Sequence, residues 1–109
     1  VLRRDLWGEL GWPLGAVAAQ AAHAATAALW QSREDEATRR YCEGEALMHM
    51  HKVVLEVKGE AQLVNLSRKL EEGGIVHTLW LEQPENTPTA LATKPYDKSE
   101  VAPLLKRYN

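Results

Sequence analysis

Polar side chains that could hold a water molecule occur within an alanine-rich stretch of the sequence. Gln20 and His23 lie three residues apart, so in a helix they share one face. There an amide and an imidazole could together hold a water molecule or a carbonyl group. The more common explanation for such a pair is a buried histidine that is satisfied by a backbone carbonyl, and the spacing alone does not separate the two interpretations.

A second polar group follows the apolar stretch 75–81. Glu82 and Glu85 supply carboxylates, and Asn86 supplies an amide. A carboxylate beside an apolar strand end can have a raised pKa, which suits general-base chemistry, whereas an ordinary polar turn is the alternative. In α/β sheets, groups just beyond the carboxyl ends of strands commonly converge on a ligand crevice. The site predicted at such an edge consists of Asp5, Gln20, His23 and Glu82.

Other site types have less support. His49 and His51 would share one face of a strand and could bind a metal with a third ligand, but no adjacent cysteine or carboxylate completes such a site. An exposed strand entrance is the alternative for this pair. The patterns GxxxxGK[ST], GxGxxG, GxSxG, HExxH and CxxC are absent, which removes the standard phosphate-loop, dinucleotide, serine-hydrolase and zinc signatures.

Length and composition favour one soluble domain, residues 1–109. The chain is 45% hydrophobic, which allows an apolar core. It has no run of 18 apolar residues, the length that a membrane-spanning helix needs. A net charge of -2 argues weakly against a strongly basic nucleic-acid binder. Cys42 is the only cysteine, which favours a reducing, cytoplasmic compartment. Because the sequence opens at Val1 without an initiating Met, we expect residues upstream of it.

The predicted helices position the first polar pair. Residues 14–31 are dominated by alanine and predict a helix, with Pro13 at its first helical position. Ser32 and Asp35 resemble a capping box for a second helix that extends to about residue 45. A third helix is expected over residues 61–70 and ends at the Gly73-Gly74 pair. Asp97 and Glu100 predict the cap of a last helix that reaches residue 108.

The predicted strands alternate with these helices. The first ends at residues 1–2, and the β-branched segment 51–58 is typical of a central strand covered on both faces. Residues 75–81 and 89–93 form the third and fourth strands. Helical crossovers then connect neighbouring parallel strands, with helices on both faces. The sequence therefore predicts an α/β fold, a three-layer α/β/α sandwich with a four-stranded mixed sheet.

Five segments resemble the type II peptidyl-tRNA hydrolase family: VLRRDL, WPLGAVAAQAAHAATAALW, HKVVLEV, HTLWLEQPEN and KPY. They span nearly the whole chain and are most similar to the divergent branch of peptidyl-tRNA hydrolase domain-containing proteins. The resemblance implies an α/β/α fold and hydrolysis of the ester that joins a peptide to the terminal ribose of tRNA. It also implies peptidyl-tRNA or tRNA as the partner, and neither a metal nor an organic cofactor.

The resemblance differs from position to position. Better-known members have GKGK before the helix, AAQxxHA within it and Asp-Ala-Gly-Arg-Thr after the third strand. Asp5, Gln20 and His23 fall on family positions, and Glu82 stands where the family aspartate does. The loop after Glu82 is also shorter. The differing residues are Leu14 and Ala16 in place of the lysines, Pro84 in place of the glycine, Glu85 in place of the arginine, and Asn86 or Thr87 nearest the threonine.

Two functions follow from these residues. The first is an esterase in which Glu82, or His23 acting through water, is the general base. Gln20 and Asn86 would then orient water or stabilise the oxyanion. The second is a non-catalytic module that keeps the fold and recognises tRNA or a ribosome-associated protein, motivated by the missing family lysine and the net charge of -2.

Binding of tRNA requires local positive charge, because its phosphates must be neutralised. Arg3 and Arg4 at the end of the first strand, with Lys94 after the fourth, are predicted to form that patch. The alternative is that these cations pair with Asp5 or Asp97. The sequence does not fix the oligomeric state, and a homodimer is one alternative.

Overall fold

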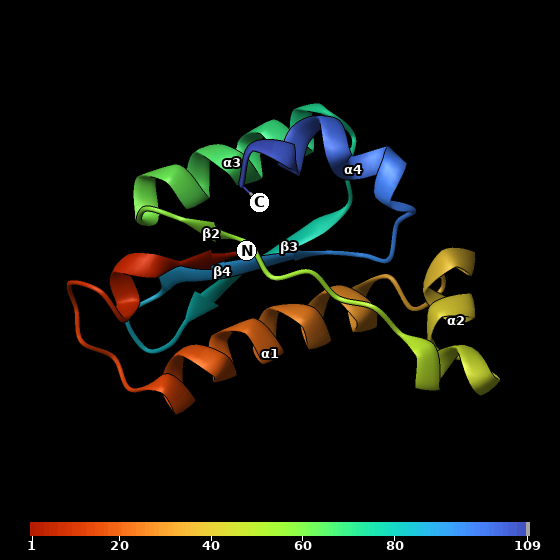
Figure 1. Cartoon of the computed structure of the whole chain (residues 1–109), viewed down its shortest axis with the longest axis horizontal. Coiled ribbons are helices and arrows are strands. Elements are labelled where there is room, and N and C mark those ends of the chain that lie inside the picture. The colour runs from red at the N-terminus through yellow and green to blue at the C-terminus, as the bar shows by residue number, and fades with distance from the viewer. Residues whose placement is uncertain (109) are drawn as a thin grey trace.

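A four-stranded mixed sheet lies between helices in the computed structural model, which describes residues 1–108 (Figure 1). Helix α1 covers one face of the sheet, while α3 and α4 cover the other. This arrangement confirms the predicted α/β class and the mixed sheet. The main elements are β1 (Leu2–Arg3), α1 (Leu14–Gln31), α2 (Glu36–Cys42), β2 (Glu56–Val57), α3 (Glu60–Glu72), β3 (His77–Glu82), β4 (Thr87–Thr93) and α4 (Lys98–Leu105).

The order of strands in the sheet is β2-β1-β4-β3. Strand β1 pairs in parallel with β2, and β4 pairs antiparallel with both β1 and β3. Strands β1, β2 and β3 therefore run in one direction and end at the same edge of the sheet, where β4 begins. We call this edge the carboxyl edge. Residues that directly follow these three strands are brought to it, as the sequence argument required.

Helix α1 has the predicted bounds, and its small residues allow it to lie close to the sheet. Pro13 does not open the helix as predicted. It is the N-cap, with an extended backbone, because helical geometry starts only at Leu14. The core on this face consists of Leu2, Leu6, Val17, Ala24 and Ala90.

The opposite face has its own apolar core beneath α3 and α4. It is formed by Val57, Leu63, Leu66, Leu70 and Leu91. Gly74, at φ 74, supplies the left-handed residue that ends α3, and the predicted capping box of Asp97 and Glu100 begins α4. None of the helices within residues 1–108 is long and apolar enough to cross a membrane.

The start of α2 differs from the prediction. Ser32 belongs to the end of α1, where its hydroxyl donates to the Ala28 carbonyl at 2.7 Å. Asp35 is the N-cap of α2, because its carboxylate accepts a hydrogen bond from the Ala37 amide. The helix ends at Cys42 and not near residue 45. A serine close to a helix boundary can cap the preceding helix as well as the next, and the sequence does not distinguish these roles.

The prediction of a central strand over residues 51–58 is wrong. Only Glu56 and Val57 belong to β2, which lies at the edge of the sheet. Val53 and Val54 are 60% and 64% exposed. Strand β2 pairs with β1 through only two residues, so the segment before Glu56 has no strand partner in the sheet. The prediction that helical crossovers connect neighbouring strands is also wrong for α3, which connects β2 and β3, the two outermost strands of the sheet.

Replacement of Ala24 by Leu should destabilise the protein by about 1–3 kcal/mol, because the larger side chain overpacks the contact between α1 and the sheet. Ala24 is 1% exposed. Urea denaturation followed by circular dichroism measures the effect. Ala18→Leu, at an exposed position of the same helix, is the matched control. Equal denaturation midpoints for Ala24→Leu and the wild type would contradict this packing.

Candidate active site

Helix α1 and strand β3 bring an imidazole, an indole and a carboxylate together at the carboxyl edge. Trp80 and Glu82 are two residues apart on β3, and the indole Nε1 donates to Glu82 Oε1 at 3.1 Å. The ring of His23 stacks on that of Trp80, with centroids 4.8 Å apart and an interplanar angle of 26°. Trp80 thus joins two residues of the predicted site, His23 and Glu82.

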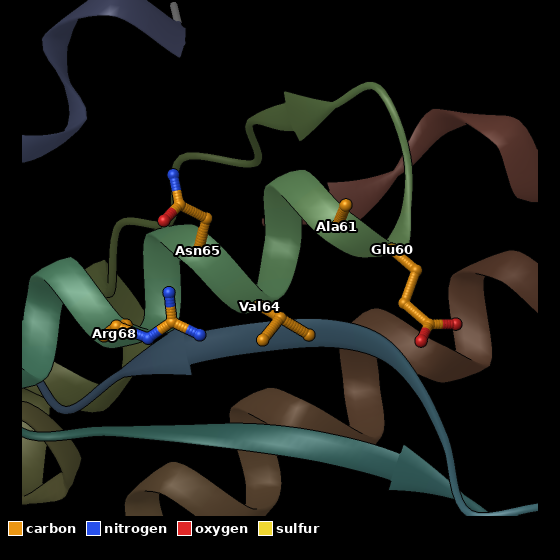
Figure 2. Close-up of a pocket in the computed structure, with 5 residues that line it drawn as sticks. All are labelled: Glu60, Ala61, Val64, Asn65 and Arg68. Carbon is orange, nitrogen blue, oxygen red and sulfur yellow. The ribbon is translucent and has the colours of Figure 1, made fainter.

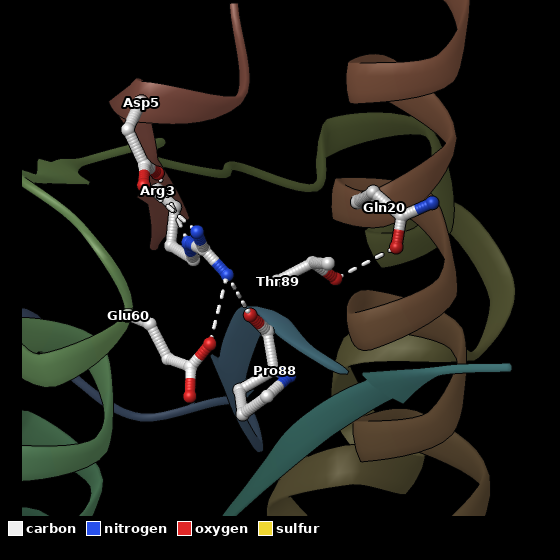
Figure 3. A network of polar contacts seen from close by, with 6 residues as sticks. All are labelled: Arg3, Asp5, Gln20, Glu60, Pro88 and Thr89. Atoms are coloured by element: carbon white, nitrogen blue, oxygen red, sulfur yellow. Dashed lines mark hydrogen bonds and ion pairs between the residues drawn. The ribbon is translucent and has the colours of Figure 1, made fainter. Parts of the chain in front are cut away.

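Gln20 completes this group from within the protein. It is 2% exposed, and its Oε1 accepts a hydrogen bond of 2.7 Å from the hydroxyl of Thr89, which is fully buried (Figure 3). Because the amide oxygen accepts this hydrogen bond, the NH2 group of Gln20 is free to donate one, and it donates to Glu82. The structure therefore brings Gln20, His23 and Glu82 together.

The pKa of Glu82 is lowered, so the raised pKa that the sequence analysis considered for a general base is wrong. The largest cause is the hydrogen bond from Trp80; a hydrogen bond from Gln20 and the charge of His23 act in the same direction. Both hydrogen bonds favour the ionised carboxylate, and they outweigh the partial burial of the side chain, which acts in the opposite direction. Glu82 is therefore a stable anion at neutral pH.

Asp5 and Arg3 form a separate ion pair that connects β1 to the elements around it (Figure 3). Arg3 is 6% exposed and donates through Nε and Nη2 to the two oxygens of Asp5, at 2.9 and 2.7 Å. Its Nη1 donates to the Pro88 carbonyl at 2.9 Å and lies 3.4 Å from Glu60 Oε1. The guanidinium lowers the pKa of Asp5. Asp5 thus belongs to this network, and Arg3 is not the free surface cation that we expected.

The other predicted cations differ in position. Arg4 is exposed directly after β1, at the carboxyl edge. Lys94 follows the far end of β4, so it lies away from that edge. It pairs with Asp35 at 3.2 Å, not with Asp97, and its Nζ lies 4.4 Å from the centroid of the Tyr96 ring.

Asn86 lies in the exposed turn between β3 and β4. Its backbone is left-handed, with φ 59, and its Oδ1 accepts a hydrogen bond of 3.0 Å from Gln83 Nε2. The amide nitrogen of Asn86 is thereby left to donate. Asparagine tolerates this backbone conformation better than most residues, which explains its place in a tight turn.

Two surface hollows lie along α3, apart from the group around Trp80. The larger, of about 480 Å³, is lined by Glu60, Ala61, Val64, Asn65 and Arg68. Figure 2 shows that these side chains come from one helix and point in different directions. The smaller, of about 230 Å³, includes Arg4 and Lys58, which follow β1 and β2. Its lining combines these two cations with one carboxylate, that of Glu56, which leaves a small excess of positive charge that suits a phosphate.

The described chain offers little for a metal ion. His49 and His51 are both exposed. Within residues 1–108, no three or more His, Cys, Asp or Glu side chains are grouped so that they could hold one.

A comparison with known families shows which family the chain belongs to. The model of the family described as "Peptidyl-tRNA hydrolase PTH2" matches residues 1–109. The chain belongs to this family. Relatives in the family include proteins from Mus musculus and Homo sapiens, both named "Putative peptidyl-tRNA hydrolase PTRHD1", which are 49% and 48% identical over 109 residues. Each match covers 99% of this chain and 76% of the relative.

Two side chains that the sequence analysis missed hold the candidate site of this family member in place. Trp80 was not among the predicted site residues, although its spacing from Glu82 places both on one face of a strand. Thr89 gave no sequence signal, because a threonine in a strand is ordinary. Its role depends on a contact with α1 across 69 residues of chain.

Replacement of Trp80 by Phe should raise the pKa of Glu82 toward the ordinary value for glutamate, because the ring remains while the N–H donor is lost. Carbon-13 NMR titration of the Glu82 carboxyl group measures the shift. A lowered pKa stabilises the folded state above the unfolded pKa, and that contribution is lost as the pH falls. Trp7→Phe is the control. An unaltered Glu82 titration in Trp80→Phe would show that the indole contact is not the main cause.

Proposed function

We propose that this protein hydrolyses the ester between a peptide and the terminal ribose of tRNA. The observation that carries the proposal is the group of Glu82, His23 and Gln20 around Trp80, at the edge where three strands end. Membership of the family supports the substrate class. The relatives are themselves named only as candidates for this activity, so turnover by this chain belongs to the proposal.

In the proposed reaction, a water molecule attacks the ester carbonyl carbon. His23 accepts the proton of that water, because imidazole gains and loses a proton near neutral pH. The anion of Glu82 stabilises the imidazolium that forms. A lowered pKa makes Glu82 better suited to this electrostatic role than to that of the base. The bond from the carbonyl carbon to the ribose oxygen then breaks, and His23 returns the proton to that oxygen.

Two amides assist in this scheme. The NH2 group of Gln20 holds the Glu82 carboxylate in place, because its oxygen is already bound to Thr89. The amide nitrogen of Asn86 donates to the oxyanion that develops on the carbonyl oxygen of the ester. The proposed machinery is thus built from neutral donors and one anion.

The tRNA contacts in this proposal come from the carboxyl edge. Arg4 and Lys58 line one hollow there and supply positive charge for phosphates. Arg3 is excluded from this role by its two carboxylate partners, and Lys94 by its position. A cytoplasmic setting belongs to the same proposal and agrees with the free, exposed thiol of Cys42.

The proposal predicts that Glu82→Gln and His23→Ala each lower turnover by about 10²–10⁴-fold, because one removes the anion that stabilises the imidazolium and the other removes the base. The measurement is the release of free tRNA from a defined N-acetylaminoacyl-tRNA by the purified chain, with no added metal. Glu85→Gln, in the exposed turn three residues after Glu82, is the matched control and should retain wild-type turnover.

A second candidate function, a non-catalytic tRNA-binding module, is favoured by one observation. Leu14, which stands where the better-known members have a lysine, is 84% exposed and carries no charge. A wild-type chain that binds the substrate without releasing tRNA would reject hydrolysis and favour this module. A loss of turnover in His23→Ala but not in Glu82→Gln would reject the assigned role of the carboxylate.

Neutralisation of Arg4 and Lys58 together should weaken tRNA binding and reduce the slope of log affinity against log salt by about one to two, because each cation releases counterions on contact with a phosphate. Affinity is measured by filter binding across a salt series for the wild type and the double Ala variant. Arg39→Ala, an exposed arginine on α2, is the control. Equal slopes for the wild type and the double variant would show that these two side chains do not contact phosphates.

A further inference from the structure

We propose that Arg3 is a positioning residue: it holds the Pro88 carbonyl so that the Thr89 hydroxyl is aimed at the Gln20 amide. The consequence for turnover rests on the proposed function, whereas the geometry does not. Two hydrogen bonds drawn in Figure 3 carry the inference: Arg3 to the Pro88 carbonyl at 2.9 Å, and Thr89 to Gln20 at 2.7 Å. The peptide bond from Pro88 to Thr89 connects them.

The first step is an irregularity in the ladder between β3 and β4. Trp80 pairs with Ala90, but the next residue, Leu81, pairs with Pro88. Thr89 is therefore an extra residue without a partner on β3, as in a β-bulge. The bulge lies opposite the step from Trp80 to Leu81, next to the candidate site.

The bulge changes the direction of the Thr89 side chain. Ala90 belongs to the core on the α1 face, and Leu91 belongs to the core on the α3 face. Strict alternation would turn Thr89 toward the α3 face, together with Leu91. Instead its hydroxyl reaches Gln20 on α1. The contact to Gln20 therefore exists only because the ladder is irregular at Thr89.

Arg3 supplies the anchor that fixes this irregular backbone. Pro88 has no N–H, so its carbonyl is the only backbone hydrogen-bonding group it offers. Arg3 Nη1 donates a hydrogen bond to that carbonyl, and the Arg3 side chain itself is only 7% exposed. Loss of the contact would remove the hydrogen bond that this partly buried carbonyl accepts and with it the tie between β4 and Arg3.

The network explains why an arginine is needed and not only a positive charge. Asp5 binds Nε and Nη2 through two oxygens, which fixes the plane of the guanidinium. This planar fork then directs Nη1 toward Pro88. A lysine ammonium is one point of charge and cannot hold Asp5 and the carbonyl in the same geometry.

The first test measures turnover in folded variants. Arg3→Lys keeps the charge and Thr89→Val keeps the shape, and each should lower kcat by about 10–10²-fold through misplacement of the site while KM changes little. The double variant should lose no more than the worse single variant, because both act on one chain of contacts. Thr89→Ser, which restores the hydroxyl, should recover kcat, and Arg39→Lys is the control for arginine replacement.

A second readout does not depend on turnover. Carbon-13 titration of the Glu82 carboxyl group should show a higher pKa in Arg3→Lys and in Thr89→Val, because the Gln20 amide no longer faces it. Trp80 on β3 and His23 on α1, the other groups that act on Glu82, are intact in both variants. The Thr89→Ser variant should titrate as the wild type does.

The outcomes separate the two proposals. A wild type without turnover, combined with a raised Glu82 pKa in both variants, rejects hydrolysis and supports the positioning role. Unaltered Glu82 titration in Arg3→Lys and Thr89→Val overturns the positioning role, as does a multiplicative loss of kcat in the double variant.

Circular dichroism melts establish that each variant is folded at the assay temperature. If Arg3→Lys does not fold, Asp5→Asn, which loosens the fork and keeps the guanidinium, takes its place with the same expected pKa shift.

Discussion

The hydrogen bond from the Thr89 hydroxyl to the Gln20 amide is the contact on which the candidate site depends. It joins β4 to α1 inside the protein, where neither side chain has access to solvent that could replace the partner. A glutamine in the middle of an alanine-rich apolar face would otherwise be costly to bury. The bond makes this burial acceptable, and it also commits the amide oxygen, so that one orientation of Gln20 is favoured.

Electrostatics divides the carboxyl edge into two parts. On one side, the charge of Arg3 is neutralised by Asp5 and Glu60, so that network carries no positive charge for a ligand. On the other side, Glu82 is an anion whose nearby donors are an indole and an amide, both neutral. The part of the edge that can attract phosphate is therefore limited to exposed cations such as Arg4, and the slightly acidic net charge of the chain is compatible with that restricted role.

Much of the fold could be predicted from the sequence because its signals are local. Alanine content and proline placement gave the bounds of α1, and the Asp97–Glu100 pair gave the start of α4. The segment 51–58 was misassigned because an apolar β-branched run does not reveal how many neighbours a strand has. Gln20, His23 and Glu82 could be chosen as site residues, but the lowered pKa of Glu82 could not, since it depends on a donor from Trp80 and on the orientation of Gln20.

The turn after β3 illustrates how the site and its surroundings can vary separately. Glu82 is held from within its own strand by Trp80 and from α1 by Gln20, whereas residues 83–86 are exposed. The turn can therefore gain or lose residues without displacing the carboxylate. The EQPEN segment is thus a connection whose length and sequence can diverge at little structural cost, while the carboxylate at its start keeps its place.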